Sequence, residues 1–224
     1  MKITNYIIIH DQFSLNWFIQ YNPDIWHKFE FILVGNKDYK DNFLILSKDK
    51  LDKFKFHFAK DYPDNIEDKL KLLAFTAWYL IVNNDICQTP YVGLFEYDVI
   101  FSQYPDFKPE KNTIYGFCKR MLPDEMYLKA VPELRKLLYQ DDIYMAENHE
   151  YWNAGSNFIM SKNFLFDFTA WYLNFVIDYD LLSHRLISHY HERLVNFYAV
   201  TNEVNNISLD ILTHKELLSH GIKL

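Results

Sequence analysis

The chain alternates between short continuous apolar runs and longer stretches in which apolar residues recur three or four positions apart. The short runs predict buried strands at 5–10, 29–34, 91–101, 113–117, 156–160 and 207–212, with a shorter one at 44–46. The longer stretches predict helices at 64–83, from about 132, at 161–178 and at 187–204. Because strands and helices alternate, we predict one α/β domain over 1–224, built as a three-layer α/β/α sandwich.

Residues that favour helix caps mark several of these starts. Asp64 stands where its side chain would cap the helix predicted at 64–83, and Glu67 follows three residues later, as in a capping box. Ser161 stands in the same position before the helix predicted at 161–178, and Pro132 suits a first-turn position. The local signals therefore support the helices that the periodicity predicts.

The apolar run at 91–101 carries two carboxylates, Glu96 and Asp98. Side chains two positions apart leave a strand on the same face, so we expect the two acids to point at one spot. Ligands of open α/β sheets bind beyond the carboxyl ends of strands. A hard divalent cation, Mn²⁺ or Mg²⁺, with phosphate oxygens completing its shell, would offset the repulsion between the acids. The alternative is a pair of solvent-exposed acids.

The composition and charge of the chain argue against several classes of function and location. The net charge is -7 and no dense Lys/Arg run is present, so we do not expect a nucleic-acid partner. Cys87 and Cys118 lack zinc-site spacing, and two cysteines suit a reducing compartment. Residues 1–10 lack a signal peptide's length and cleavage site, and no apolar run is long enough to span a bilayer. We expect a cytoplasmic protein without a transmembrane segment.

Three segments, taken in order, resemble glycosyltransferases of the GT-A fold. Glu96-Tyr97-Asp98 resembles their D-x-D motif, with glutamate in first place. The segment 152–160, WNAGSNFIM, resembles their F-N-A-G-hydrophobic segment, and 191–196, HERLVN, resembles the E-R-hydrophobic-x-N helix of small capsule, lipopolysaccharide and viral sugar transferases. The resemblance implies a mixed sheet of the nucleotide-diphospho-sugar transferase type. It also implies a nucleotide-binding half at 1–101 and an acceptor-binding half at 102–224.

The resemblance implies a metal-dependent glycosyltransferase that uses Mn²⁺ or Mg²⁺. It would move a sugar from a nucleotide-diphosphate sugar, UDP-sugar favoured, to a hydroxyl of a glycan or glycoconjugate. An acceptor anchored in a membrane would be compatible with peripheral association. The residues that it implies are the following: for catalysis Glu192 and Asp98; for the donor His10, Asp11, Glu96, Tyr97, Asp98 and Lys223; for the acceptor Trp152, Asn153, Gly155 and Ser156; for the metal Glu96, Asp98 and His214.

Each of these assignments has a plainer counterpart. Glu192, the expected base, could lie on a solvated helix face near Arg193. Asp11 could cap a helix or loop, and the segment 153–156 could be an ordinary turn. Other residues also have alternatives. Trp152 and Tyr151 could be core aromatics, and Lys223 could be simply solvated. Asp141, Asp142 or Glu150 could act in place of Glu192, and His220 could replace His214.

The chain also departs from the family in two places. Many bacterial relatives carry His-Tyr-Arg-Arg where this chain has Glu-Tyr-Asp, and the Lys-Pro-Trp ending of retaining relatives is missing. Inversion and retention therefore both stay open. Two further functions also stay open: a non-catalytic carbohydrate-binding or assembly module on the same fold, and a sugar nucleotidyltransferase. The second would need a glycine-rich loop after the first strand, where this chain has His-Asp-Gln-Phe-Ser at 10–14.

Overall fold

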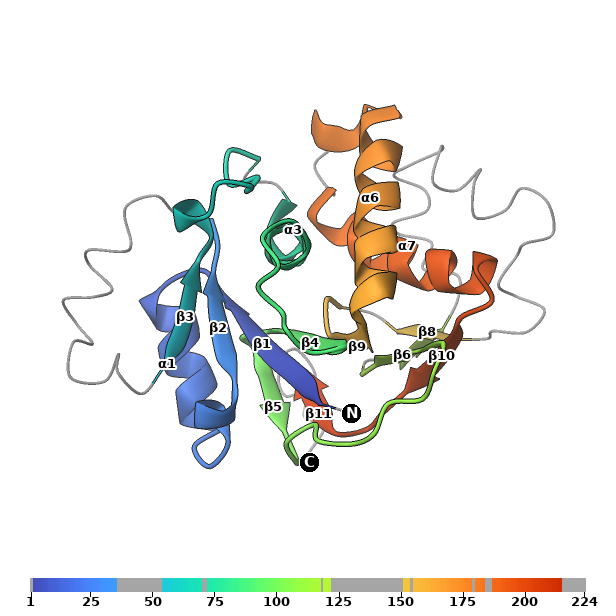
Figure 1. The fold of residues 1–224 in the computed structure, drawn as a ribbon. Helices are drawn as coiled ribbons and strands as arrows, with labels where there is room; N and C mark the ends of the chain where they lie inside the picture. The colour runs from blue at the N-terminus through green and yellow to red at the C-terminus, as the bar shows by residue number, and fades with distance from the viewer. Residues whose placement is uncertain are drawn as a thin grey trace.

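The computed structural model describes residues 2–35, 54–69, 72–117, 119–121, 151–153, 155–178, 180–183 and 187–214. Within these residues, seven strands form one sheet in the order β10-β6-β9-β4-β1-β2-β3 (Figure 1). Their bounds are β1 Ile3–Ile9, β2 Glu30–Leu33, β3 Lys55–Phe58, β4 Tyr91–Glu96, β6 Thr113–Gly116, β9 Phe158–Ser161 and β10 Asn205–Ser208. Neighbouring strands are parallel except at β9, which runs antiparallel to both β4 and β6.

Helices and two small strand pairs surround this sheet. The helices in the described residues are α1 Gln12–Tyr21, α3 Ala74–Asn83, α6 Lys162–Asp178 and α7 Ile187–Thr201, with 3₁₀ turns η1 Trp26–Lys28, η2 Ala59–Asp61 and η4 Leu181–Ser183. The small antiparallel pairs are β5 Val99–Phe101 with β11 Leu212–His214, and β7 Lys119–Met121 with β8 Tyr151–Asn153. Figure 1 shows α3, α6 and α7 above the sheet and β5 with β11 below it. The predicted three-layer α/β architecture with a mixed sheet is confirmed.

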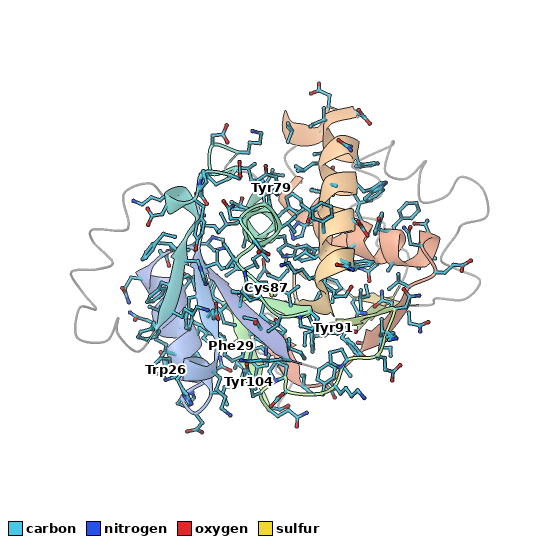
Figure 2. All side chains as sticks on the ribbon, in the orientation of Figure 1. Trp26, Phe29, Tyr79, Cys87, Tyr91 and Tyr104 are labelled. Carbon is cyan, nitrogen blue, oxygen red and sulfur yellow. The ribbon has the colours of Figure 1, made fainter. Side chains whose placement is uncertain are left out.

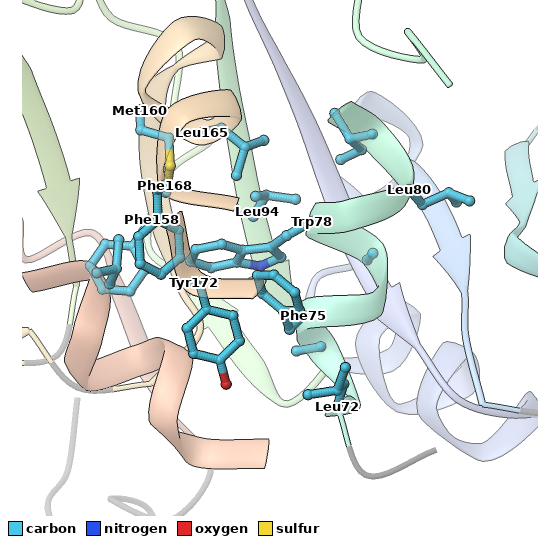
Figure 3. Packing of buried hydrophobic residues seen from close by; sticks show 14 of the residues in the cluster. Leu72, Phe75, Trp78, Leu80, Leu94, Phe158, Met160, Leu165, Phe168 and Tyr172 are labelled. Carbon is cyan, nitrogen blue, oxygen red and sulfur yellow. The ribbon is translucent and has the colours of Figure 1, made fainter. Parts of the chain in front are cut away.

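Aromatic side chains fill the core on both faces of the sheet. On the upper face the fully buried Trp78 of α3 has its ring 6.0 Å from Phe158, 5.8 Å from Phe168 and 5.2 Å from His191 (Figure 3). On the lower face Phe29 packs its ring 5.1 Å from Tyr104 (Figure 2). The upper contacts join α3, α6, α7 and β9, so one core holds the helical layer on the sheet.

The helix predicted at 64–83 is wrong in its first half, because α3 begins only at Ala74. Asp64 caps no helix there, and the residue before α3, Leu73, has a φ of 41°, which a right-handed α-helix does not allow. Glu67 instead accepts a hydrogen bond of 2.8 Å from the backbone amide of Gly35, two residues after β2. A tertiary contact thus replaces the predicted capping box.

Further predicted boundaries also change. The strand predicted at 91–101 divides into β4 and β5, because a turn at 97–98 separates them, and the strand predicted at 207–212 is the end of β10 and the start of β11. The helix α1 has no counterpart among the predicted elements. Ser161 does cap α6, since its Oγ accepts a 3.1 Å hydrogen bond from the Phe164 amide. The strand predicted at 44–46 and the helix from about 132 lie outside the described residues.

Within the described residues, no helix is both long and apolar enough to cross a membrane.

Candidate functional site

Two parallel strands end side by side and place the expected donor residues together. The register of β1 and β4 pairs Ile8 with Glu96, so both strands end at the same edge of the sheet. His10 follows β1 directly, and Tyr97 and Asp98 form the turn after β4. The rings of His10 and Tyr97 meet edge to face with centroids 6.0 Å apart. This edge is the place where open α/β sheets bind ligands.

Several carboxylates act electrostatically on the two rings at this edge. Burial raises the pKa of Tyr97, and the charges of Asp98, Asp11 and Glu96 raise it further. Burial lowers the pKa of His10, although Asp11 and Asp98 oppose this effect. The phenol therefore stays protonated and the imidazole neutral at neutral pH, and the carboxylates around them receive no compensating charge from these two rings.

The two acids of the E-x-D motif do not both lie on the strand, which corrects the expectation that strand alternation alone puts them on one face. Glu96 is the last residue of β4, whereas Asp98 belongs to the following turn. Strand alternation fixes the side on which Glu96 leaves the sheet, but the direction of Asp98 depends on the turn. Both acids nevertheless act electrostatically on Tyr97, which lies between them in the sequence.

Asp11 caps α1. Its carboxylate accepts a 2.7 Å hydrogen bond from the Ser14 amide, and the Ser14 hydroxyl accepts a 2.9 Å hydrogen bond from the Asp11 amide in return. This capping box satisfies amides that the first helical turn leaves open. The segment after β1 therefore enters a helix at once instead of forming the glycine-rich loop that a nucleotidyltransferase would need.

The segment 155–157 connects the end of β4 to α7. The Oδ1 atom of Asn157 accepts a 2.9 Å hydrogen bond from the Glu96 amide. The amide of Gly155 donates a 3.1 Å hydrogen bond to Glu192 Oε2, and Arg193 Nη1 lies 2.8 Å from the same oxygen. Glu192 is only 8% exposed, so the alternative of a solvated helix face is wrong. The carboxylate is held by an ion pair and a backbone amide near the sheet edge.

Asn153 and Ser156 make buried contacts within the protein. The Asn153 amide donates a 3.1 Å hydrogen bond to Asn196 Oδ1, and its side-chain Nδ2 donates a 2.6 Å bond to Asn206 Oδ1. Ser156 is fully buried with its Oγ 2.8 Å from Nε2 of His191. These contacts fix the segment before β9 against α7 and β10. Their acceptor-binding role stays a prediction.

Sequence reasoning gave no role in the site to two residues at this edge, Asn157 and Arg193. The signal for Asn157 was an amide side chain inside an otherwise apolar strand-like run; the signal for Arg193 was its adjacency to Glu192. The side chains of several expected site residues lie outside the described part of the structure: Trp152, His214, His220, Lys223, Tyr151, Asp141, Asp142 and Glu150. In the part that is described, no three His, Cys, Asp or Glu side chains gather as a ready metal site.

The architecture is identified by its similarity to solved structures. No protein-family profile and no curated protein matches the sequence. Among solved structures, the bifunctional glycosyltransferase WbbM in its apo form is similar, with a TM-score of 0.61 at 15% identity, over 96% of this chain. The chain has a glycosyltransferase fold. It spans only 45% of the WbbM chain.

Two structures of the galactosyltransferase LgtC are also similar over 92% of this chain and 72% of theirs. One, in complex with donor and acceptor sugar analogues, has a TM-score of 0.46 at 11% identity, and the other, an active-site mutant, has 0.49 at 12%. The glycosyltransferase fold inferred from the three sequence segments is confirmed by WbbM, whereas the site residues rest on the geometry described above.

Proposed function

We propose that this protein is a metal-dependent glycosyltransferase that moves a sugar from a nucleotide-diphosphate sugar, UDP-sugar favoured, to a hydroxyl group of a glycan or glycoconjugate. The observation that carries the proposal is the sheet edge where β1 and β4 end together. The charges of Asp98, Asp11 and Glu96 all act on Tyr97 there. The Asn157 contact then links that edge to the buried Glu192 region. Open α/β sheets bind ligands beyond the carboxyl ends of their strands, which supports the proposal.

The residues at this edge suit a hard divalent cation. Glu96 and Asp98 supply carboxylate oxygens, and Mn²⁺ or Mg²⁺ is commonly bound by one or two carboxylates together with substrate phosphates. A diphosphate would otherwise meet a negative surface, since Asp11 lies at the same edge. When bound, the cation would neutralise negative charge on the diphosphate leaving group.

The reaction exchanges one bond at the anomeric carbon. The bond from that carbon to the diphosphate oxygen breaks, and its electron pair leaves with the nucleoside diphosphate. The acceptor oxygen forms the new bond to the sugar and loses its proton. We assign proton removal to Glu192, whose carboxylate is held in one orientation by Gly155 and Arg193. His10 and Tyr97 would shape the donor side of the site.

The test is thermal stability with UDP or GDP, each with and without Mn²⁺. A ligand that binds only the folded state raises the unfolding midpoint, so we expect a rise with nucleotide and metal together and little with either alone. Asp98→Asn should abolish the rise, whereas Asp106→Asn, an exposed control on the loop after β5, should keep it. An Asp98→Asn protein that responds like wild type would contradict the metal assignment.

The role of Glu192 as the base can be tested by measuring the rate of sugar transfer. Glu192→Gln keeps the side-chain size and should leave nucleotide binding within about twofold, while losing about 10²–10⁴-fold in transfer rate, the usual contribution of a general base. Binding of sugar nucleotides by a wild-type protein that neither hydrolyses nor transfers them would instead favour a carbohydrate-binding module.

A further inference from the structure

Among the described residues, Asn157 has a partner for only one half of its side-chain amide. Its side chain is 1% exposed. The Oδ1 atom accepts the hydrogen bond from the Glu96 amide, which fixes the amide orientation and leaves Nδ2 as the group on the other side. Among the described residues Nδ2 has no hydrogen-bond acceptor. Buried amide donors almost always have a partner, so this one needs an explanation.

The Nδ2 atom lies beneath Gly155. A Cβ placed on Gly155 would be 3.2 Å from Nδ2, tighter than an ordinary contact. Gly155 has a φ of +79°, a conformation that disfavours any residue with a side chain, and it is only partly buried. The backbone position next to the unsatisfied donor therefore carries no side chain. Because Nδ2 is itself buried, a substrate oxygen reaches it only if Gly155 moves, and this movement is part of the inference.

The position of Nδ2 between two groups indicates which part of a substrate it would meet. On one side Oδ1 of Asn157 accepts its hydrogen bond from the backbone amide of Glu96, the first acid of the E-x-D motif and the last residue of β4. On the other side Gly155 is bonded to Glu192. A transferred sugar has to lie between the leaving diphosphate and the attacking hydroxyl. A group that lies between the contacts to Glu96 and Glu192 would thus meet the sugar rather than the nucleotide.

We propose that the Asn157 amide donates a hydrogen bond from Nδ2 to an oxygen of the donor sugar and so helps to select that sugar. This inference rests on the proposed function. Under this proposal Asn157 has two roles: its Oδ1 positions the end of β4, and its Nδ2 binds the substrate.

The variant Asn157→Asp separates the two tasks. Aspartate retains an oxygen to accept the Glu96 amide but loses the donor. We would titrate UDP, UDP-glucose, UDP-galactose and UDP-N-acetylglucosamine in the presence of Mn²⁺, by calorimetry. The sugar nucleotide that wild type binds most tightly should bind Asn157→Asp about tenfold more weakly, the loss expected for one hydrogen bond. Affinity for UDP should change by less than about twofold.

Two controls keep the result interpretable. Asn163→Asp adds the same charge at an exposed position of α6 and should change neither affinity. Asn157→Ala removes both contacts, and it should lower the unfolding midpoint as well as the affinity for the sugar nucleotide. Retention of wild-type selectivity for the sugar nucleotide by a folded Asn157→Asp overturns the inference, and so does an equal loss for UDP and the sugar nucleotide.

The wild-type titrations distinguish this inference from the function on which it rests. Wild type that binds no nucleotide at all contradicts the proposed function. Wild type that binds UDP as tightly as every UDP-sugar leaves donor binding intact but overturns the sugar contact of Asn157.

Discussion

Gly93 in the middle of β4 has no room for a side chain. A Cβ there would lie 2.1 Å from Oδ1 of Asn5 and 2.9 Å from the ring of Phe95. Asn5 is itself buried on β1, and its Nδ2 donates a 3.2 Å hydrogen bond to the carbonyl of Pro105. The absence of a side chain at Gly93 therefore allows β1 and β4, the two strands that end at the candidate site, to pack closely.

We expect Gly93→Ala to lower the free energy of unfolding by about 1–3 kcal/mol, because the added methyl overpacks the strand pair. Asn5→Ala should also destabilise, but the double variant should lose less than the sum of the two, since removing Asn5 frees the space. Urea denaturation of the four proteins measures this coupling. Strict additivity would show that the strands adjust without cost.

The sequence predicts some residues of the site and not others. Glu96 could be placed at a strand end, because a continuous apolar run leads up to it. Asn157 could not, because its contact with Glu96 depends on how β9 lies against β4, and the two partners are 61 positions apart. The local pattern indicates which face of a strand is buried, but it does not say which distant strand will pair with it.

At the scale of the elements, Glu30 of β2 contacts two side chains of β3, the strand at one edge of the sheet. Its carboxylate lies 2.9 Å from Nε2 of His57 and also pairs with Lys55. Burial alone would raise the pKa of Glu30, but the hydrogen bonds from these two partners outweigh it and hold the pKa below its ordinary 4.5. Stabilisation from this carboxylate is thus present above about pH 4.5 and is lost as the pH falls through the lowered value.

We therefore expect Glu30→Gln to be less stable than wild type at pH 7 and the difference to shrink below about pH 4.5. Denaturation midpoints between about pH 3 and 7 measure it. Asp68→Asn is a suitable control, since Asp68 pairs with Lys69 at 3.5 Å on the surface and surface pairs contribute little. A difference that stays constant with pH would contradict the role of the Glu30 charge.

Element boundaries show where local signals fail. The apolar spacing of 66–81 continues through the whole segment, yet the helix starts only at Ala74. The reason is tertiary: Glu67 is committed to the amide of Gly35, and Leu73 lies at positive φ. By contrast Ser161 caps α6 as predicted, because its bond to Phe164 is made within one turn.

At the scale of the whole molecule, Trp78 of α3 packs against Phe158 of β9 and Phe168 of α6, and so holds the helices on the sheet (Figure 3). Trp78→Ala should cost about 3–5 kcal/mol of unfolding free energy, because the ring is fully buried and a cavity would remain. Phe166→Ala, at a ring that is 57% exposed on α6, is the matched control and should change stability by less than about 0.5 kcal/mol. Guanidinium denaturation measures both, and similar losses would contradict the assigned core.

The layered architecture was predictable, because strand and helix periodicities alternate and most strands of the sheet were detectable locally. The strand order was not, since it is set by long-range pairing. The reversed direction of β9 in particular has no signature in the sequence around 158–161. The division into a nucleotide half and an acceptor half stays a prediction.

The reversal of β9 has an evolutionary consequence. Because this strand runs against β4 and β6, its beginning meets the end of β4 and the end of β6. The ends of β4 and β6 and the start of β9 therefore lie at one rim, although they come from three separate parts of the sequence. Substitutions in any of these three segments could change the lining of the rim, and so the acceptor it suits, while the pairing of β1 with β4 is kept.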